Sequence, residues 1–291
     1  MQINDIDLEK IIQLVTQRTG IIPRASHRDG IKSYVDKLLS AKNCTVANYI
    51  NSIQTDSSLF MQLVNESTVN ETYFFREEKQ FSFLRDRLFP MWKALRGSST
   101  MKIWSAACSY GEEAYSLALL AKECHVNCSI TASDINSEVL EHCQKGEFLS
   151  TSIRQVDGVQ FKNLLTRYIR TDGKIEFDSE IKTLITTRRI NLSKLDTPEM
   201  DMLLPKNQDM IFLRNVFIYF NQDLRSRILR TIAQKCLADG GVLFVSMSEI
   251  AQLDSSVMPP SFEKVMDGSV FYFHKKQTGL GGQNSYGKNL C

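Results

Sequence analysis

The chain has 291 residues, of which 43% are hydrophobic and 23% are charged, a composition typical of a folded protein of about two domains. Lys and Arg number 35 against 33 Asp and Glu, so the chain lacks the basic excess typical of nucleic-acid-binding proteins. No apolar run approaches the roughly 20 residues that span a bilayer. The N-terminus lacks the basic and apolar segments of a signal peptide, so the seven cysteines are expected to be reduced thiols. We therefore expect a cytoplasmic protein without membrane insertion and without a nucleic-acid partner.

Residues 1–70 have the apolar spacing of amphipathic helices. Apolar side chains recur every three or four positions in four successive stretches, and the first stretch stops at Gly20 and Pro23. The apolar positions are Leu8, Ile11, Ile12 and Val15, then Ile31, Val35, Leu38 and Leu39, then Val46, Tyr49, Ile50 and Ile53, then Leu59, Phe60, Leu63 and Val64. This spacing predicts an all-α helical bundle domain over residues 1–70.

Strand and helix patterns alternate within residues 71–277. The predicted strands lie at 101–104, 129–133, 210–213 and 242–246, and the predicted helices lie at 112–123, 137–145 and 222–237. Such alternation with short connections indicates parallel strands joined by crossover helices. We therefore predict an α/β domain with a doubly wound, Rossmann-like sheet.

A stretch rich in β-branched residues interrupts this alternation at about residues 167–190. Asp172-Gly173 lies between two such runs, which is a hairpin signal. We predict a small antiparallel β-subdomain inserted in the α/β domain. The final segment, 278–291, contains four glycines and few apolar side chains, and we expect it to be a disordered tail.

Small residues connect the first predicted strand to the helix that follows it. Residues 103–113 read Ile-Trp-Ser-Ala-Ala-Cys-Ser-Tyr-Gly-Glu-Glu, so a ligand can approach the backbone and the helix N-terminus. Neither GxGxxG nor GxxxxGK[ST] occurs, which disfavours a nucleotide triphosphatase. The turn favours a nucleotide-like cofactor, and a turn that only packs helix on strand is the alternative.

Polar side chains end two more of the predicted strands. Asp134 follows the second strand, where a carboxylate can accept the hydroxyl protons of a ribose. Its alternative role is to cap the next helix. Asn215 follows the buried strand 210–213, at the edge where open α/β sheets bind ligands. Its alternative role is to close a turn.

Five segments of the chain together match one family of enzymes. They are Asn-Glu-Thr-Tyr-Phe-Phe-Arg at 70–76, the stretch 104–118, Ala-Ser-Asp-Ile at 132–135, Leu-Arg-Asn-Val-Phe-Ile-Tyr-Phe at 213–220, and the stretch 237–249. In this order and spacing the chain resembles CheR-type chemotaxis receptor methyltransferases, as far as about His274. These enzymes transfer a methyl group from S-adenosylmethionine to glutamate side chains of chemoreceptors. The family also has a small helical domain and a β-subdomain.

The resemblance implies a binding site for S-adenosylmethionine, with Asp134 holding the ribose. By motif, its residues are Asn70, Thr72, Arg76, Glu113, Asp134, Asn191, Leu192, Asn215 and Val216. Ala107 and Tyr110 depart from the family, which often has Gly and Thr there. We expect no metal site, because Cys124, His125 and Cys128 lack a second CxxC pair.

The implied reaction needs no strong general base. A glutamate carboxylate, with an ordinary pKa of about 4.3, is already ionised at pH 7. The cofactor's sulfonium activates the methyl group, so the protein has to align carboxylate oxygen, methyl carbon and sulfur. Arg76 is the candidate to orient the carboxylate, because a guanidinium binds it bidentately, and an ion pair with Glu77, Glu78 or Asp86 is the alternative. Tyr219 is a candidate catalytic hydrogen-bond donor or a core aromatic.

Basic residues gather between positions 18 and 42, where six Lys and Arg stand against two Asp. Arg28 and Lys32 lie one helical turn apart, a candidate docking face for the glutamate-rich helices of a receptor, or a solvated surface. The β-subdomain is a candidate site for a receptor's C-terminal peptide by strand addition. We expect a monomer. The alternative function is a non-catalytic S-adenosylmethionine-sensing or partner-binding module of the same fold.

Overall fold

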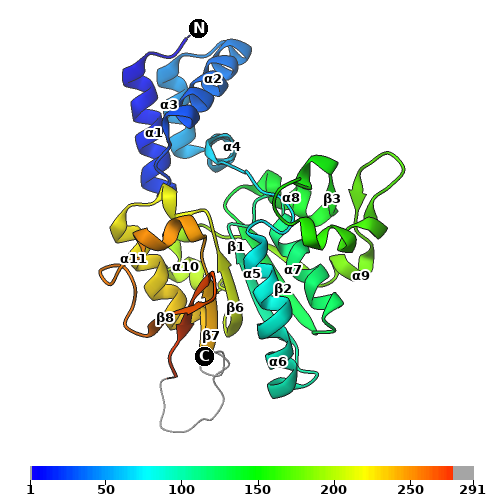
Figure 1. Ribbon diagram of the computed structural model, residues 1–291. Coiled ribbons are helices and arrows are strands. Elements are labelled where there is room, and N and C mark those ends of the chain that lie inside the picture. The colour runs from blue at the N-terminus through cyan, green and yellow to red at the C-terminus, as the bar shows by residue number, and fades with distance from the viewer. Residues whose placement is uncertain (1, 278–291) are drawn as a thin grey trace.

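The N-terminal part of the chain is a helical bundle that stands above the rest of the molecule (Figure 1). The computed structural model describes residues 2–277. Within them, the bundle contains α1 (Asp5–Thr19), α2 (Ala25–Lys42), α3 (Val46–Thr55) and α4 (Ser57–Ser67). Their apolar faces meet in one core, in which Ile11, Val15 and Ile31 have no exposed surface. The apolar spacing thus produces the expected helices, each burying one face.

Local sequence determines where the first helix begins and ends. The Asn4 side chain caps α1 by accepting a hydrogen bond from the Asp7 backbone N–H at 2.9 Å. Gly20 ends the helix in a left-handed conformation, with φ of 74°. A Cβ atom at Gly20 would lie 2.3 Å from Leu224 Cδ2, so glycine also permits the close approach of the bundle to the α/β domain.

Among the described residues, seven strands form one twisted sheet in the order β5-β2-β1-β6-β7-β9-β8. The strands are β1 (Met101–Ala106), β2 (Cys128–Asp134), β5 (Ile185–Arg189), β6 (Gln208–Leu213), β7 (Leu237–Phe244), β8 (Phe262–Asp267) and β9 (Val270–Lys275). The first five are parallel, and β8 and β9 are antiparallel. The chain reverses its direction of winding between β1 and β6, which creates the switch point where such sheets bind ligands.

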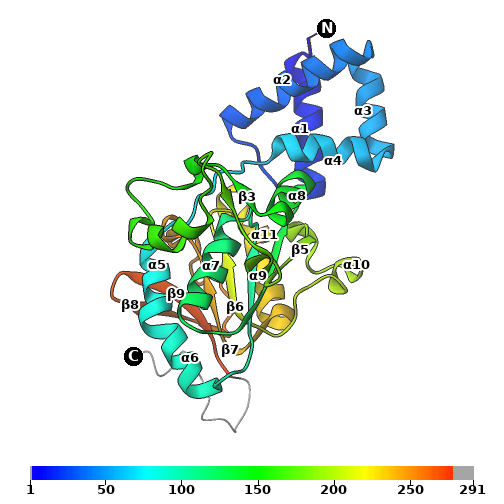
Figure 2. The ribbon, with the colours of Figure 1, turned by 90° about the vertical axis from the view of Figure 1, so that its right-hand side faces the viewer.

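Helices cover both faces of this sheet and build two cores (Figures 1 and 2). Alternate strand residues point to opposite faces, so Ile103 and Phe212 join one core while Trp104 and Leu213 join the other. The first core includes side chains of α5 (Glu78–Phe83), α6 (Phe89–Arg96), α7 (Glu112–Glu123) and α8 (Ser137–Lys145). The second includes side chains of α11 (Gln222–Thr231). This architecture confirms the predicted doubly wound α/β class.

The small antiparallel sheet has different boundaries from those predicted. It pairs β3 (Glu147–Phe148) with β4 (Ile175–Glu176). The prediction that the insert extends to residue 190 is wrong, because β5 (Ile185–Arg189) is an edge strand of the main sheet, parallel to β2. Two short helices lie before and after β5 in the chain, α9 (Ser179–Lys182) and α10 (Pro198–Asp201). An edge strand is only half buried, so its β-branched residues resemble a hairpin strand in the sequence.

Two further predictions concern the C-terminal part of the chain. The predicted helix 222–237 is α11 followed by a wider π-helical turn, Ile232–Cys236, and β7 begins at Leu237 rather than at 242. Gly240 and Gly241 resemble a turn in the sequence, but Gly240 adopts φ of 80° within the strand, where the register with β6 shifts. The predicted disordered tail, 278–291, lies outside the described residues. Within residues 2–277, no helix is long and apolar enough to cross a membrane.

Candidate cofactor and active site

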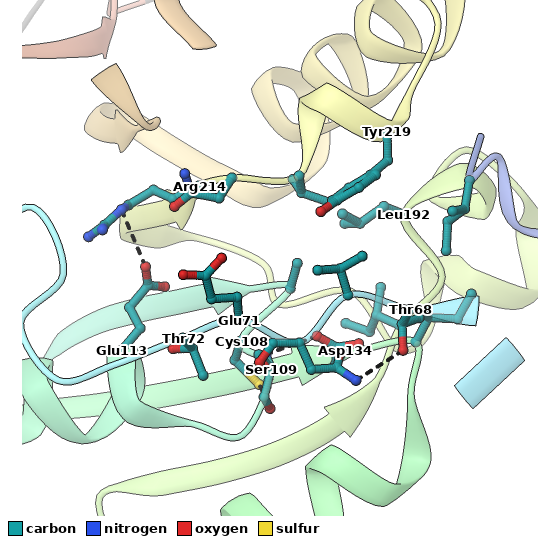
Figure 3. A pocket seen from close by; sticks show the side chains of 18 of the residues that line it. Thr68, Glu71, Thr72, Cys108, Ser109, Glu113, Asp134, Leu192, Arg214 and Tyr219 are labelled. Atoms are coloured by element: carbon teal, nitrogen blue, oxygen red, sulfur yellow. Dashed lines mark hydrogen bonds and ion pairs between the residues drawn. The ribbon is translucent and has the colours of Figure 1, made fainter. Parts of the chain in front are cut away.

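A pocket opens at the carboxyl ends of β1, β2 and β6, between the α/β domain and the end of α1 (Figure 3). It is lined by all the residues predicted from motifs to bind the cofactor or the acceptor at this edge. These are Asn70, Thr72, Arg76, Glu113, Asp134, Asn191, Leu192, Asn215, Val216 and Tyr219. They come from five separate parts of the sequence, which the strand ends and the segment between α4 and α5 bring together.

The turn between β1 and α7 brings backbone close to the pocket. Ala107 and Ser109 adopt left-handed conformations with φ of 58° and 53°, so Ala107 holds a conformation that favours the Gly common in the family. A Cβ atom at Gly111 would lie 2.5 Å from Cys143 Sγ, so only glycine lets the turn pack against α8. Tyr110 contacts the same helix, because its ring lies edge-on to His142 of α8 with 5.0 Å between centroids.

Asp134 lies at the end of β2 on the pocket wall and is 8% exposed. Its Oδ2 accepts from the Ser109 backbone N–H at 2.9 Å and its Oδ1 from the Asn136 N–H at 3.0 Å. Asn136, not Asp134, caps α8, because its side chain accepts from the backbone of Glu138 and Val139. Burial raises the pKa of Asp134, and the backbone hydrogen bonds oppose that rise. Each carboxylate oxygen retains lone-pair capacity for a ligand hydroxyl.

A buried ion pair lies at one end of the pocket, away from Asp134 and Leu192 (Figure 3). Arg214 Nε is 3.6 Å from Glu113 Oε2, and the Ser105 hydroxyl donates to Glu113 Oε1 at 2.6 Å. Burial raises the pKa of Glu113, and the Arg214 charge opposes that rise. Arg214 also donates through Nη2 to the Arg76 carbonyl at 2.6 Å, while its buried Nη1 has no hydrogen-bond partner among the described residues.

Two of the predicted asparagines have structural contacts of their own. The Asn191 side chain donates to the Arg18 carbonyl at 2.9 Å and accepts from the Ser193 N–H, which joins α1 to the α/β domain. Asn215 has φ of 57°, and its side chain donates to the Ser246 hydroxyl at 3.0 Å. The turn-closing alternative for Asn215 therefore has a structural basis. Leu192 and Val216, which follow the two asparagines in the chain, are apolar residues of the pocket wall.

Aromatic and cationic side chains also line the pocket. Arg76 donates to the Glu71 carbonyl at 2.8 Å, and its guanidinium lies 5.5 Å from the Tyr73 ring centre. The alternative of an Arg76 side-chain ion pair has no support among the ion pairs of the described residues. Tyr219 is half-buried, with the Arg24 guanidinium 5.7 Å from its ring centre. Burial raises the pKa of the Tyr219 hydroxyl, which keeps it protonated as a donor.

Arg28 and Lys32 do not line the pocket but lie on α2, and both are paired within the bundle. Arg28 forms an ion pair with Glu9, and Lys32 forms one with Asp36 at 3.1 Å. Lys32 also donates to the Ile3 carbonyl at 3.2 Å.

Three pocket features were not predicted from the sequence. Arg214 lies within the recognised motif 213–220, and an arginine directly after a buried strand is an unusual residue that could have been noted. Its role could not be predicted, because it depends on the ion pair with Glu113. The Ser109 backbone amide cannot be read from a side-chain pattern. Thr19 and Ile21 place the end of the bundle in the pocket wall, which no local pattern indicates.

Known proteins with similar sequences are methyltransferases. Residues 70–264 match the family described as CheR methyltransferase, SAM binding domain. The chain belongs to the CheR methyltransferase family. It is 29% identical to a chemotaxis protein methyltransferase of Borreliella burgdorferi over 89% of this chain and 94% of that protein. It is also 29% identical to that of Escherichia coli over 86% of both chains. Among solved structures, magnesium protoporphyrin IX methyltransferase from Synechocystis matches with a TM-score of 0.35 and 11% identity, covering 85% of this chain and 97% of that chain.

Membership in this family makes the protein an S-adenosylmethionine-dependent methyltransferase, and the pocket fits that cofactor. The unpartnered Arg214 Nη1 can donate to a carboxylate, such as the one at the methionine end of the cofactor. Asp134 has capacity for ribose hydroxyls, and the apolar Leu192 and Ile190 suit a flat base. The donors, acceptors and apolar walls therefore match the three chemical parts of the ligand.

Proposed function

We propose that this protein methylates glutamate side chains of chemoreceptors, using S-adenosylmethionine. The observation that supports it best is Arg76, a half-buried cation that lines the pocket next to Arg214. A guanidinium binds an incoming carboxylate, so the pocket suits an acidic acceptor. The names of the relatives point to the same pathway. We further propose that the protein acts as a cytoplasmic monomer on the receptors' cytoplasmic regions.

The mechanism follows from positioning rather than proton transfer. The cofactor supplies an activated methyl group, and the acceptor carboxylate is already the nucleophile at neutral pH. Arg76 orients the carboxylate, and the Tyr219 hydroxyl, in the same pocket, donates a hydrogen bond. Holding both reactants in line contributes about 7–11 kcal/mol to such bimolecular reactions. Arg76 should orient the acceptor carboxylate without binding it tightly, because ground-state binding alone does not accelerate methyl transfer.

The direct test is a transfer assay with methyl-labelled S-adenosylmethionine and membranes that contain a chemoreceptor. We expect label on the receptor that alkali releases as methanol, since a glutamate methyl ester hydrolyses in base. Peptide mapping then identifies the modified glutamates. Cofactor binding without transfer to any receptor would contradict the proposal and favour the non-catalytic sensing module.

Replacing Arg76 with alanine should lower kcat/KM for the acceptor about 10–100-fold, because a charge-assisted hydrogen bond contributes about 1.5–3 kcal/mol. The Kd of the cofactor, measured by calorimetry, should change much less. Arg170→Ala is the matched control, since Arg170 is exposed and pairs only with Glu176 among the ion pairs of the described residues. Near-normal methylation by Arg76→Ala would remove Arg76 from the mechanism.

The basic face of α2 is the second part of the proposal. Reversing charge at Arg28 and Lys32 to glutamate should raise the KM for the receptor several-fold, about 3–10-fold, with little change in kcat. Both residues already pair with Glu9 and Asp36, and such exposed pairs contribute at most about 1 kcal/mol, so the fold should survive. Lys10→Glu on α1 is the control, since Lys10 pairs with Asp7 in the same bundle. An unchanged KM would reject this docking face.

A further inference from the structure

Asp157 collects hydrogen bonds from the segment that carries Arg76. It lies in the insert, between β3 and β4. Its Oδ2 accepts from the Tyr73 hydroxyl at 2.9 Å and from the Glu77 N–H at 2.7 Å. Its Oδ1 accepts from the Glu78 N–H at 3.0 Å and from the Gly158 N–H at 3.0 Å. One carboxylate thus holds the residues on both sides of Arg76.

The backbone around Arg76 needs such support. Phe75 and Glu77 adopt left-handed conformations with φ of 56° and 61°, which side-chain-bearing residues rarely hold without tertiary contacts. The insert approaches this segment so closely that a Cβ atom at Gly158 would lie 2.7 Å from the Phe74 carbonyl oxygen. A substituted residue at 158 would therefore push Asp157 away from the turn.

Packing fixes the rest of this segment. The Phe75 ring stacks on Phe161 of the insert with 4.8 Å between centroids, and the Phe75 N–H donates to the Ser116 hydroxyl at 2.9 Å. The Phe74 N–H donates to the Ser152 carbonyl at 2.9 Å. With Phe74 and Phe75 buried, Asp157 adds contacts to the Tyr73 hydroxyl and to the turn after Arg76. The same turn is also held by Arg214, which donates to the Arg76 carbonyl, and by the Ser246 hydroxyl, which donates to the Glu77 carboxylate.

The Tyr73 ring connects these contacts to the pocket. Tyr73 and Arg76 both line it, and the Arg76 guanidinium lies 5.5 Å from the ring centre. Fixing the Tyr73 hydroxyl fixes the ring, and the ring restricts the guanidinium through the cation–π contact. We propose that Asp157 is a positioning residue that holds Arg76 in the orientation needed for methyl transfer. This inference rests on the proposed role of Arg76 in binding the acceptor.

An asparagine cannot replace Asp157, although it has the same shape. Four donors converge on two carboxylate oxygens, and an amide offers only one oxygen. Its NH2 group would face one of the two donor pairs. Burial raises the pKa of Asp157, but the hydrogen bonds from Glu78, Glu77, Tyr73 and Gly158 outweigh it and hold the pKa below its ordinary value. The carboxylate is therefore ionised at neutral pH.

The test compares three variants of the full-length protein in the methyl-transfer assay. Asp157→Asn should lower kcat/KM for the acceptor about tenfold, since small displacements of a positioning group slow reactions by such factors. Tyr73→Phe, which removes only the hydroxyl contact, should give a smaller loss in the same direction. Asp172→Asn is the control in the same insert, because among the hydrogen bonds of residues 2–277 Asp172 accepts only from the Lys174 N–H, at an exposed turn. The cofactor Kd should stay within about twofold for all three.

A double-mutant cycle separates positioning from general structure. If Asp157 acts through Arg76, Asp157→Asn should cost no further activity once Arg76 is alanine. The same loss in both backgrounds, a parallel loss of cofactor affinity, or wild-type activity of Asp157→Asn and Tyr73→Phe would each overturn the inference. An inactive wild-type protein would instead overturn the proposed function, and the inference with it. Thermal unfolding verifies that each variant is folded, and Tyr73→Phe supplies the test if Asp157→Asn is not.

Discussion

Replacement of Arg214 by methionine is expected to lower the free energy of unfolding by about 3–5 kcal/mol, the usual cost of removing one partner of a buried ion pair. The Arg214 side chain is 3% exposed, and its guanidinium lies between Glu113 and the Phe81 and Phe212 rings. Methionine fills a similar apolar volume and contacts aromatic rings well. The loss therefore reports chiefly on the Glu113 carboxylate, which loses its ion-pair partner and keeps only the weaker influence of the Arg76 charge.

The pH dependence of this loss has a definite sign. Burial raises the pKa of Glu113 and Arg214 opposes the rise, so removing Arg214 should raise that pKa further. A carboxyl whose folded-state pKa is raised contributes stability below its unfolded pKa and loses it as pH rises through the folded pKa. The loss in the free energy of unfolding, relative to the wild type, should therefore be smaller near pH 5 than near pH 8, at about the two ends of the pH range to be measured.

Urea denaturation of the cofactor-free protein across this pH range measures the effect. Arg85→Met is the matched control, because Arg85 is 38% exposed and pairs with Asp86, so its loss should stay below about 1 kcal/mol at every pH. A deficit in Arg214→Met that is flat with pH, or that grows toward acid, would mean that Glu113 is not the group left uncompensated.

Asp134→Ala should weaken binding of S-adenosylmethionine by about 10²–10⁴-fold. Two ribose hydroxyls donating to a carboxylate contribute about 1.5–3 kcal/mol each, and a tenfold change in Kd is about 1.4 kcal/mol. The Ser109 and Asn136 N–H groups also lose their acceptor, which should loosen the turn that approaches the cofactor. Calorimetry with the cofactor and with S-adenosylhomocysteine should show the same loss, since both carry the ribose.

Two further variants make this prediction specific. Asp134→Asn keeps the shape and one oxygen, so it should fall between wild type and Asp134→Ala. Asp196→Ala removes a carboxylate that pairs with Arg227 outside the pocket and should bind the cofactor normally. Affinity of Asp134→Ala within about threefold of wild type, in a variant that unfolds normally, would exclude Asp134 as the ribose ligand.

The sequence determined the local elements and the strand ends of this protein. Helical spacing at Leu8, Ile11 and Val15 predicted a buried face because every side chain on that face lies within four residues of the next. Apolar strands that end in Asp134 or Asn215 predicted polar groups at one edge of a parallel sheet, since parallel strands present the same end to the same side. That rule brought Asp134 and Asn215 to one pocket, whereas Asn70, Thr72 and Arg76 follow α4 rather than a strand and were indicated only by the family resemblance.

The tertiary structure alone decided which side chains pair across the chain. The Tyr73 hydroxyl reaches Asp157, 84 residues away, and the Asn191 side chain reaches the Arg18 carbonyl, 173 residues away. The β-rich stretch ending at residue 190 was divided between an insert and an edge strand for the same reason. Periodicity records only which face of an element is buried, whereas a pairing depends on how distant elements are placed by the packing of both cores. The supports of Arg76 and Glu113 are therefore properties of the fold.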